Sequence, residues 1–156
     1  MKSNIKKNYV LGRVDKIDLP DLELFDLDAK IDTGAYSSSI HCHNIEIEKV
    51  NGKEILKCNL LDPKHPVYNE KVFRFDDFTR TRVKSSNGQV QKRFLIRTDI
   101  LLFGNRFSTD FTLNDRQEMK YPILLGRKLL RQGFVVDVKQ FNRSFRRKSK
   151  LEADNK

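Results

Sequence analysis

Cysteine is scarce in this chain of 156 residues, and long apolar segments are missing. Two cysteines, Cys42 and Cys58, are too few for the disulfide framework on which small secreted domains depend. The first seven residues are polar and basic, so they do not resemble a secretory signal. No apolar run approaches the roughly 20 residues that a membrane-spanning helix needs. We therefore expect a soluble protein of the reducing cytoplasm, without a membrane partner.

Internal repeats and long linkers rich in Gly, Ser or Pro are also missing. A length of 156 residues suits one domain with its own core and is too short for two comfortable ones. We expect a single domain over residues 1–141, followed by a basic tail over residues 142–156. Because runs of like charge are usually solvated, this tail is predicted to be disordered.

Negative charge is in deficit, with 31 Lys and Arg residues against 21 Asp and Glu residues and a formal net charge of +10. A surplus of this size favours an anionic partner, such as an acidic peptide, a ribosomal surface or nucleic acid. No aromatic and basic recognition motif for nucleic acid is visible outside the tail. Nucleic acid is therefore the least favoured of these partners.

The sequence does contain a series of short strand-like segments, each ended by turn residues. Two tight turns, Asn51-Gly52 and Ser86-Asn87-Gly88, suit hairpins because Asn-Gly readily adopts positive φ. One helix is indicated over Arg127 to Gln132, with Gly133 placed to end it. Many short strands and one short helix near the C-terminus predict an all-β fold, a small closed barrel. The expected strands are Asn8–Val14, Leu22–Ile31, Ser39–Val50, Lys53–Leu61, Val72–Ser85, Gln89–Leu102, Arg106–Leu113, Tyr121–Leu125 and Phe134–Val138.

One short motif carries recognisable chemistry. Residues 29–35 are typical of a strand that enters a tight turn, with Asp32 at the bend. Gly34 lets the backbone approach a neighbour closely, and the Thr33 hydroxyl can fix the turn by a hydrogen bond. Asp-Thr-Gly by itself is more often an ordinary turn, because Asp and Gly both tolerate turn geometry.

A second motif changes that balance. Residues 122–133 form an apolar strand, a glycine at position 126 and a short helical segment. In this order, the two motifs resemble the retropepsin family of aspartic peptidases, whose Asp-Thr-Gly-Ala carries the catalytic carboxylate and whose later Ile-Ile-Gly-Arg-x-Leu-Leu strand passes behind it. The chain is most similar to a bacterial RimB-like branch known as ATP-dependent zinc proteases, found beside or fused to RimK-type, ATP-grasp glutamate ligases. The resemblance covers about residues 8–139. Its matching segments are Ala29–His41, Phe111–Arg116 and Met119–Asp137.

The resemblance implies a retropepsin-like barrel with the activity of an aspartic peptidase. Asp32, Thr33 and Gly34 would form the catalytic turn, and Ala35 would border the substrate cleft. Such a peptidase needs two carboxylates that share one proton, whereas this chain contains a single Asp-Thr-Gly. We therefore predict a C2 homodimer with the active site on its two-fold axis. No cofactor is predicted.

The second hairpin falls where retropepsins carry the flap that closes over the substrate. We therefore predict that Ser86 and Gly88 contact the substrate. The alternative is a plain surface hairpin. This segment also lacks the several glycines of viral flaps.

Basic residues suggest a preference for acidic peptides. In viral retropepsins an Asp four residues after the catalytic Asp pairs with the arginine of the Gly-Arg pair, and here that position is Tyr36. Arg127 would then be released to bind a substrate carboxylate in bidentate geometry, and Arg116, Arg82 and Lys84 would add positive charge around the cleft. An ion pair between Arg127 and a carboxylate of its own chain would count against this hypothesis. The plainer alternative is an ordinary surface or structural ion pair for each arginine.

The run His41-Cys42-His43 invites a zinc interpretation. On a strand, His41 and His43 share one face and Cys42 points to the other. Two ligands are too few for zinc, and Cys58 and His65 do not add a recognisable zinc-site spacing. We therefore predict no metal, place Cys42 in the core, and assign His41 a structural or substrate-contacting role.

Three functions stay open. The first is a homodimeric aspartic endopeptidase that cleaves acidic or polyglutamylated peptides, because short members of the resembled branch are similar to peptidases that trim glutamate tails from a ribosomal protein. A glutamate ligase of the ATP-grasp kind would then be an associated partner. The second is a non-catalytic binding module for an acidic or ribosomal partner, which would have no need of Asp32. The third is a zinc-dependent peptidase.

Overall fold

The computed structural model describes residues 8–61, 70–84, 87–115 and 120–154. Strands dominate these ranges, so the predicted all-β fold is confirmed. The strands are β1 (Tyr9–Leu11), β2 (Val14–Leu19), β3 (Leu24–Ile31), β4 (Ser38–Val50), β5 (Lys53–Leu60), β6 (Phe73–Phe75), β7 (Thr79–Lys84), β8 (Val90–Leu102), β9 (Asn105–Asn114), β10 (Ile123–Leu125) and β11 (Phe134–Val136). The helical segments are the 3-10 turn η1 (Pro20–Leu22), α1 (Arg127–Leu130) and α2 (Arg143–Asp154).

Six strands close into a ring. β10 pairs with β3 in parallel, and antiparallel pairs lead from β3 through β2 and β8 to β9. β9 pairs with β4 in parallel, and β4 returns to β10 in an antiparallel pair. The apolar positions of these strands supply much of the core. Residues of this core that are at most 1% exposed include Ile17, Leu27, Ile40, Ile100 and Phe111.

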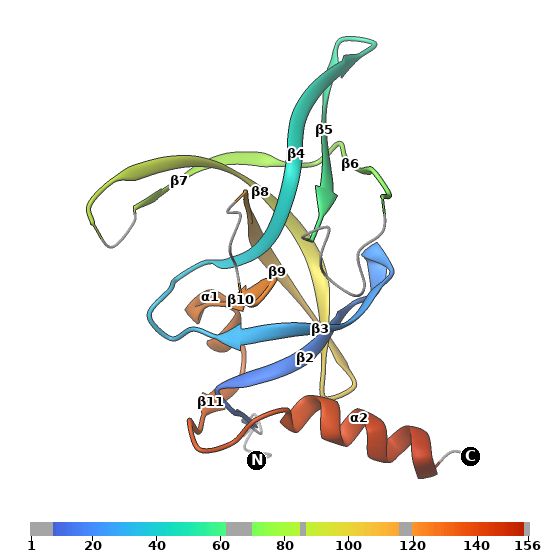
Figure 1. Ribbon diagram of the computed structural model, residues 1–156, viewed down its shortest axis with the longest axis vertical. Coiled ribbons are helices and arrows are strands. Elements are labelled where there is room, and N and C mark those ends of the chain that lie inside the picture. The colour runs from blue at the N-terminus through green and yellow to red at the C-terminus, as the bar shows by residue number, and fades with distance from the viewer. Residues whose placement is uncertain (1–7, 62–69, 85–86, 116–119, 155–156) are drawn as a thin grey trace, which may run out of the picture.

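Two hairpins extend from the ring (Figure 1). β4 and β5 join at Asn51 and Gly52, which have φ values of 52° and 79°, the positive-φ pair of a type I′ turn. This predicted hairpin is confirmed. β7 and β8 form the second hairpin, with Gly88 at φ 84° in its turn. In Figure 1 this hairpin and the loop between β3 and β4 are on the same side of the ring.

β1 belongs to a separate two-stranded sheet, in which it pairs in parallel with β11. It ends just before Gly12, where a Cβ atom would lie 2.1 Å from the carbonyl oxygen of Gln140. Only glycine fits this close approach. The chain then starts β2 as a new strand, whereas the sequence predicted one strand over Asn8–Val14 and missed β2.

Residues 143–154 form α2, so the predicted disorder of the basic tail is wrong (Figure 1). The Asp15 carboxylate of β2 accepts hydrogen bonds from the backbone N–H groups of Ser144 at 3.0 Å and Phe145 at 3.1 Å. These N–H groups belong to the first turn of the helix, whose N–H groups have no acceptors within the helix itself. Burial raises the pKa of Asp15, and the hydrogen bonds that it accepts offset this only in part.

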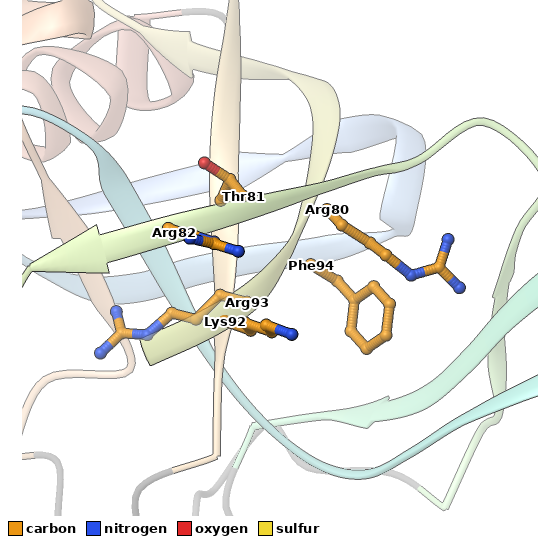
Figure 2. Close-up of a pocket in the computed structure, with 6 residues that line it drawn as sticks. All are labelled: Arg80, Thr81, Arg82, Lys92, Arg93 and Phe94. Atoms are coloured by element: carbon orange, nitrogen blue, oxygen red, sulfur yellow. The ribbon is translucent and has the colours of Figure 1, made fainter. Parts of the chain in front are cut away.

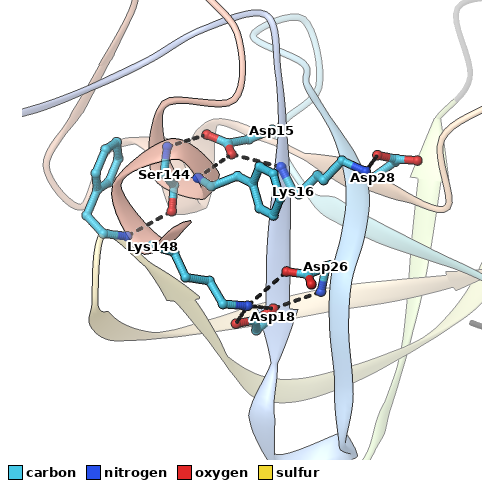
Figure 3. A network of polar contacts seen from close by, with 9 residues as sticks. Asp15, Lys16, Asp18, Asp26, Asp28, Ser144 and Lys148 are labelled. Carbon is cyan, nitrogen blue, oxygen red and sulfur yellow. Dashed lines mark hydrogen bonds and ion pairs between the residues drawn. The ribbon is translucent and has the colours of Figure 1, made fainter. Parts of the chain in front are cut away.

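Lys148 holds the middle of α2 against two strands (Figure 3). Its Nζ lies 2.9 Å from Oδ2 of the buried Asp18 and 2.8 Å from Oδ1 of Asp26. Burial alone lowers the pKa of Lys148, but the hydrogen bonds to Asp26 and Asp18 outweigh it and raise this pKa above 10.5. The basic segment is therefore not only solvated, because Lys148 within it binds two carboxylates that lie more than 100 positions earlier in the sequence. Within the described ranges, no helix is long and apolar enough to cross a membrane.

Candidate active site

The candidate catalytic carboxylate lies in the turn that follows β3. Oδ1 of Asp32 accepts a hydrogen bond from the Gly34 backbone N–H at 3.1 Å, and the Asp32 carbonyl accepts one from Ala35 at 3.2 Å. The Asp32 backbone N–H donates to the Leu125 carbonyl at 2.9 Å, which ties the turn to β10. Asp32 is partly exposed, and Thr33 and Gly34 are exposed. The turn is therefore held by backbone contacts while its acidic group stays open to solvent.

The start of α1 packs directly against this loop at Gly126. A Cβ atom there would lie 2.7 Å from the carbonyl oxygens of both Tyr36 and Ser37, so a larger residue would collide with backbone. The Gly126 N–H donates to Oγ of the fully buried Ser38 at 3.1 Å. The two motifs that were noted in the sequence therefore meet in space. The role of the Ser38 hydroxyl in joining them was not predicted, because the sequence around Ser38 does not indicate which group it binds.

The exposed side chain of Arg127 lies over the same turn. Its Nη1 donates to the Thr33 carbonyl at 3.0 Å, and its guanidinium carbon is 6.0 Å from the centre of the Tyr36 ring. The Arg127 backbone N–H also donates to the Ala35 carbonyl at 2.8 Å. In the part of the chain that the structure describes, no carboxylate pairs with Arg127. The ion pair that would count against a substrate role is thus not found there.

His41 lies in the interior, with 4% of its surface exposed. Its backbone N–H donates to the Pro122 carbonyl and its carbonyl accepts from the Leu61 N–H, both at 2.8 Å. This placement suits the structural role for His41 better than direct contact with a substrate. Of the other predicted substrate-binding residues, Gly88 is exposed in the β7–β8 turn. Ser86 and Arg116 lie outside the described residues.

The two cysteines are buried side by side, so the prediction that Cys42 belongs to the core is confirmed. A hydrogen bond with Cys58, together with burial, raises the pKa of the Cys42 thiol far above its ordinary value. Among the described residues, no group of three His, Cys, Asp or Glu side chains is placed to hold a metal ion.

A basic pocket of about 330 Å³ lies on the β7–β8 hairpin (Figure 2). The sequence analysis noted Arg82 and Lys84 of this hairpin but not the pocket as a unit. In the sequence, the sign of this pocket is the basic residue at every second position of β7. The lining residues from β8 become visible only from the register of the two strands. The pocket is lined by Arg80, Thr81, Arg82, Lys92, Arg93 and Phe94.

The ring of strands, the Asp-Thr-Gly turn and the Gly-Arg start of α1 that packs against it are the features of a retropepsin-like fold. The chain belongs to the RimB-like family, described as retropepsin-like aspartic endopeptidase RimB, and the match covers residues 10–148. The resemblance identified from the sequence is therefore confirmed. The match also extends into α2, beyond the segment over which the resemblance was seen.

The chain is also similar to curated relatives and to a solved structure. Proteins named "Probable alpha-L-glutamate ligase" are 33% identical over 133 residues in Shewanella pealeana and 32% identical over 133 residues in Shewanella halifaxensis. Each alignment covers 83% of this chain, which spans only 28% of the length of these relatives. A crystal structure of a Legionella pneumophila protein of unknown function is similar with a TM-score of 0.71 and 27% identity, covering 88% of this chain and 99% of that one.

Proposed function

We propose that the protein is an aspartic endopeptidase that works as a homodimer, with Asp32 of each subunit forming the catalytic pair. The observation that carries this proposal is the Asp32 carboxylate itself, which is open to solvent on a turn fixed by β10 and α1. A single chain offers one such turn, and a C2 dimer would bring two identical turns together on its axis.

In this mechanism the two Asp32 carboxyl groups share one proton. The ionised group takes a proton from a water molecule, and the protonated group polarises the carbonyl of the scissile peptide bond. The pair would titrate with apparent pKa values that belong to both groups together. Thr33 and Gly34 would hold the two turns in register and approach the substrate backbone, and Ala35 would border the cleft.

The proposed substrate is an acidic peptide, in particular one with a glutamate tail. Arg127 supports this, since it lies over the catalytic turn and has no carboxylate partner among the described residues. The net charge of +10 also favours acidic partners. The names of the relatives connect this kind of domain with glutamate ligation, so a glutamate ligase is the associated partner that we propose.

The test compares wild-type protein with Asp32→Asn on peptides that carry a tail of eight glutamates and on the same peptides without it. Mass spectrometry should show shortening of the glutamate tail by the wild type alone, because the amide cannot act as the base. If neither protein cleaves the peptides and size analysis shows a monomer, a non-catalytic binding module would instead be favoured.

A further inference from the structure

One face of the β7–β8 hairpin concentrates positive charge. Alternate residues of a strand share a face, and residues in register on the neighbouring strand lie beside them. The register therefore places three basic residues of β7 and one of β8 on the same face. Figure 2 draws three of these four, Arg80, Arg82 and Lys92. The facing pairs are Arg80 with Phe94, Arg82 with Lys92, and Lys84 with Val90.

At the inner end of this face the positive charge is balanced. Arg80 pairs with Glu54 of β5 at 3.0 Å, and its guanidinium carbon lies 5.6 Å from the Phe78 ring centre and 5.5 Å from the Phe94 ring centre. The two rings contact each other edge to face, with centres 5.8 Å apart. Arg80 is thus neutralised, and it fixes the base of the hairpin.

The outer end carries charge that is not balanced. Arg82 and Lys92 lie directly opposite each other in the ladder, and like charges in this position repel. Arg82, Lys84 and Lys92 are exposed, and none has an acidic partner in the described segments. Both Arg82 and Lys92 line the pocket of about 330 Å³, as does Phe94. An anion bound here would relieve the repulsion.

We propose that this face, the outer basic face of Arg82, Lys84 and Lys92, binds an acidic polypeptide in extended conformation. Alternate residues of a strand are about 6.6 Å apart, and the alternate side chains of an extended peptide repeat at the same distance. Successive carboxylates on one side of such a peptide can therefore lie next to Arg82 and Lys84 in turn, and Arg82 can donate two parallel hydrogen bonds to one of them. The identity of this polypeptide as the glutamate tail of the substrate rests on the proposed function. The face would hold a part of the tail that is not being cleaved.

The experiment measures binding of a fluorescent peptide of eight glutamates by anisotropy, with Asp32→Asn as the background so that the probe stays intact. We expect Arg82→Gln with Lys92→Gln to weaken binding by about tenfold or more, since each removed contact is charge-assisted. The matched control, Arg147→Gln with Lys150→Gln, removes the same charge from exposed positions of α2 and should change the affinity less than about twofold. The Arg82 and Lys92 variant should unfold at or above the wild-type temperature, because it removes a repulsive pair.

Equal losses in the two double variants would overturn the proposal, since only net charge would then matter. Tighter binding of a single-stranded RNA of equal charge than of the glutamate peptide would also overturn it in favour of nucleic acid. A separate cleavage assay with wild-type Asp32 distinguishes the two hypotheses. If glutamate tails are cleaved at the same rate with and without the Arg82→Gln and Lys92→Gln substitutions, this inference is refuted and the proposed function stands. Binding that depends on the basic face, without any cleavage, supports the inference and refutes the peptidase.

Discussion

At the residue scale, the candidate site depends on two close contacts between backbone segments that are distant in the sequence. Gly126 permits the approach of α1 to the Tyr36 and Ser37 carbonyls, and Ser38 joins the two segments by a hydrogen bond. The Asp-Thr-Gly turn and the later glycine could be predicted because each leaves a local mark in the sequence. The role of Ser38 could not, because its burial is decided by residues nearly 90 positions away.

Replacing Ser38 with alanine should therefore destabilise the protein. The Gly126 N–H would be left buried without its acceptor, which costs about 1–3 kcal/mol of unfolding free energy. Chemical denaturation of the purified variant measures this loss. Ser37→Ala, at the neighbouring and less buried position, serves as the matched control and should stay within about 0.5 kcal/mol of the wild type. Equal stability of the two variants would show that the Ser38 hydroxyl does not hold α1 in place.

At the element scale, β2 and α2 are the longest elements that the sequence did not predict. Asp15 and Asp18 interrupt the apolar residues of β2, and the basic residues of α2 led to the prediction of a disordered tail. The charged groups of each element find their partners only on the other element. Asp15 accepts a hydrogen bond from the first turn of α2, and Asp18 forms an ion pair with Lys148. Patterns within one segment cannot reveal a partner of this kind. The strand predicted over Val72–Ser85 likewise divides into β6 and β7.

Lys148 should give the stability of the fold a dependence on alkaline pH. Its pKa is raised above 10.5 in the folded state, so its stabilising effect is fully present below pH 10.5 and is lost as the pH rises through the raised value. Lys148→Met should unfold at a lower temperature than the wild type at pH 7, and this difference should shrink above pH 10.5. Thermal unfolding followed by circular dichroism across this range measures both.

Lys150→Met provides the comparison for that series, because Lys150 is an exposed lysine of the same helix. Its difference from the wild type should be small and constant with pH. A difference for Lys148→Met that does not change with pH would mean that the contacts with Asp18 and Asp26 do not stabilise α2 through their charge.

At the scale of the whole molecule, the single Asp-Thr-Gly per chain makes a quantitative prediction about mixed dimers. If active dimers need Asp32 from both subunits, equal co-expression of wild type and Asp32→Asn should leave about one quarter of the activity per total protein, because half of the dimers are mixed and a quarter are doubly substituted. Active monomers would retain half. The measurement is the rate of glutamate-tail cleavage after purification through one tag that both chains carry, so that all three kinds of dimer are recovered.

The β1–β11 pairing affects when the N-terminal part of the fold can form during synthesis. Tyr9 pairs with Phe134, and Asp15 caps a helix that begins at Arg143. A chain that emerges from the ribosome therefore keeps β1 without this neighbour until residue 134 has been translated, and the Asp15 carboxylate without these donors until residue 145 has been translated. Contacts between residues so far apart in the chain also slow folding, because a long loop must close before they form. Segments translated more than 100 residues later thus complete the part of the fold that contains β1 and β2.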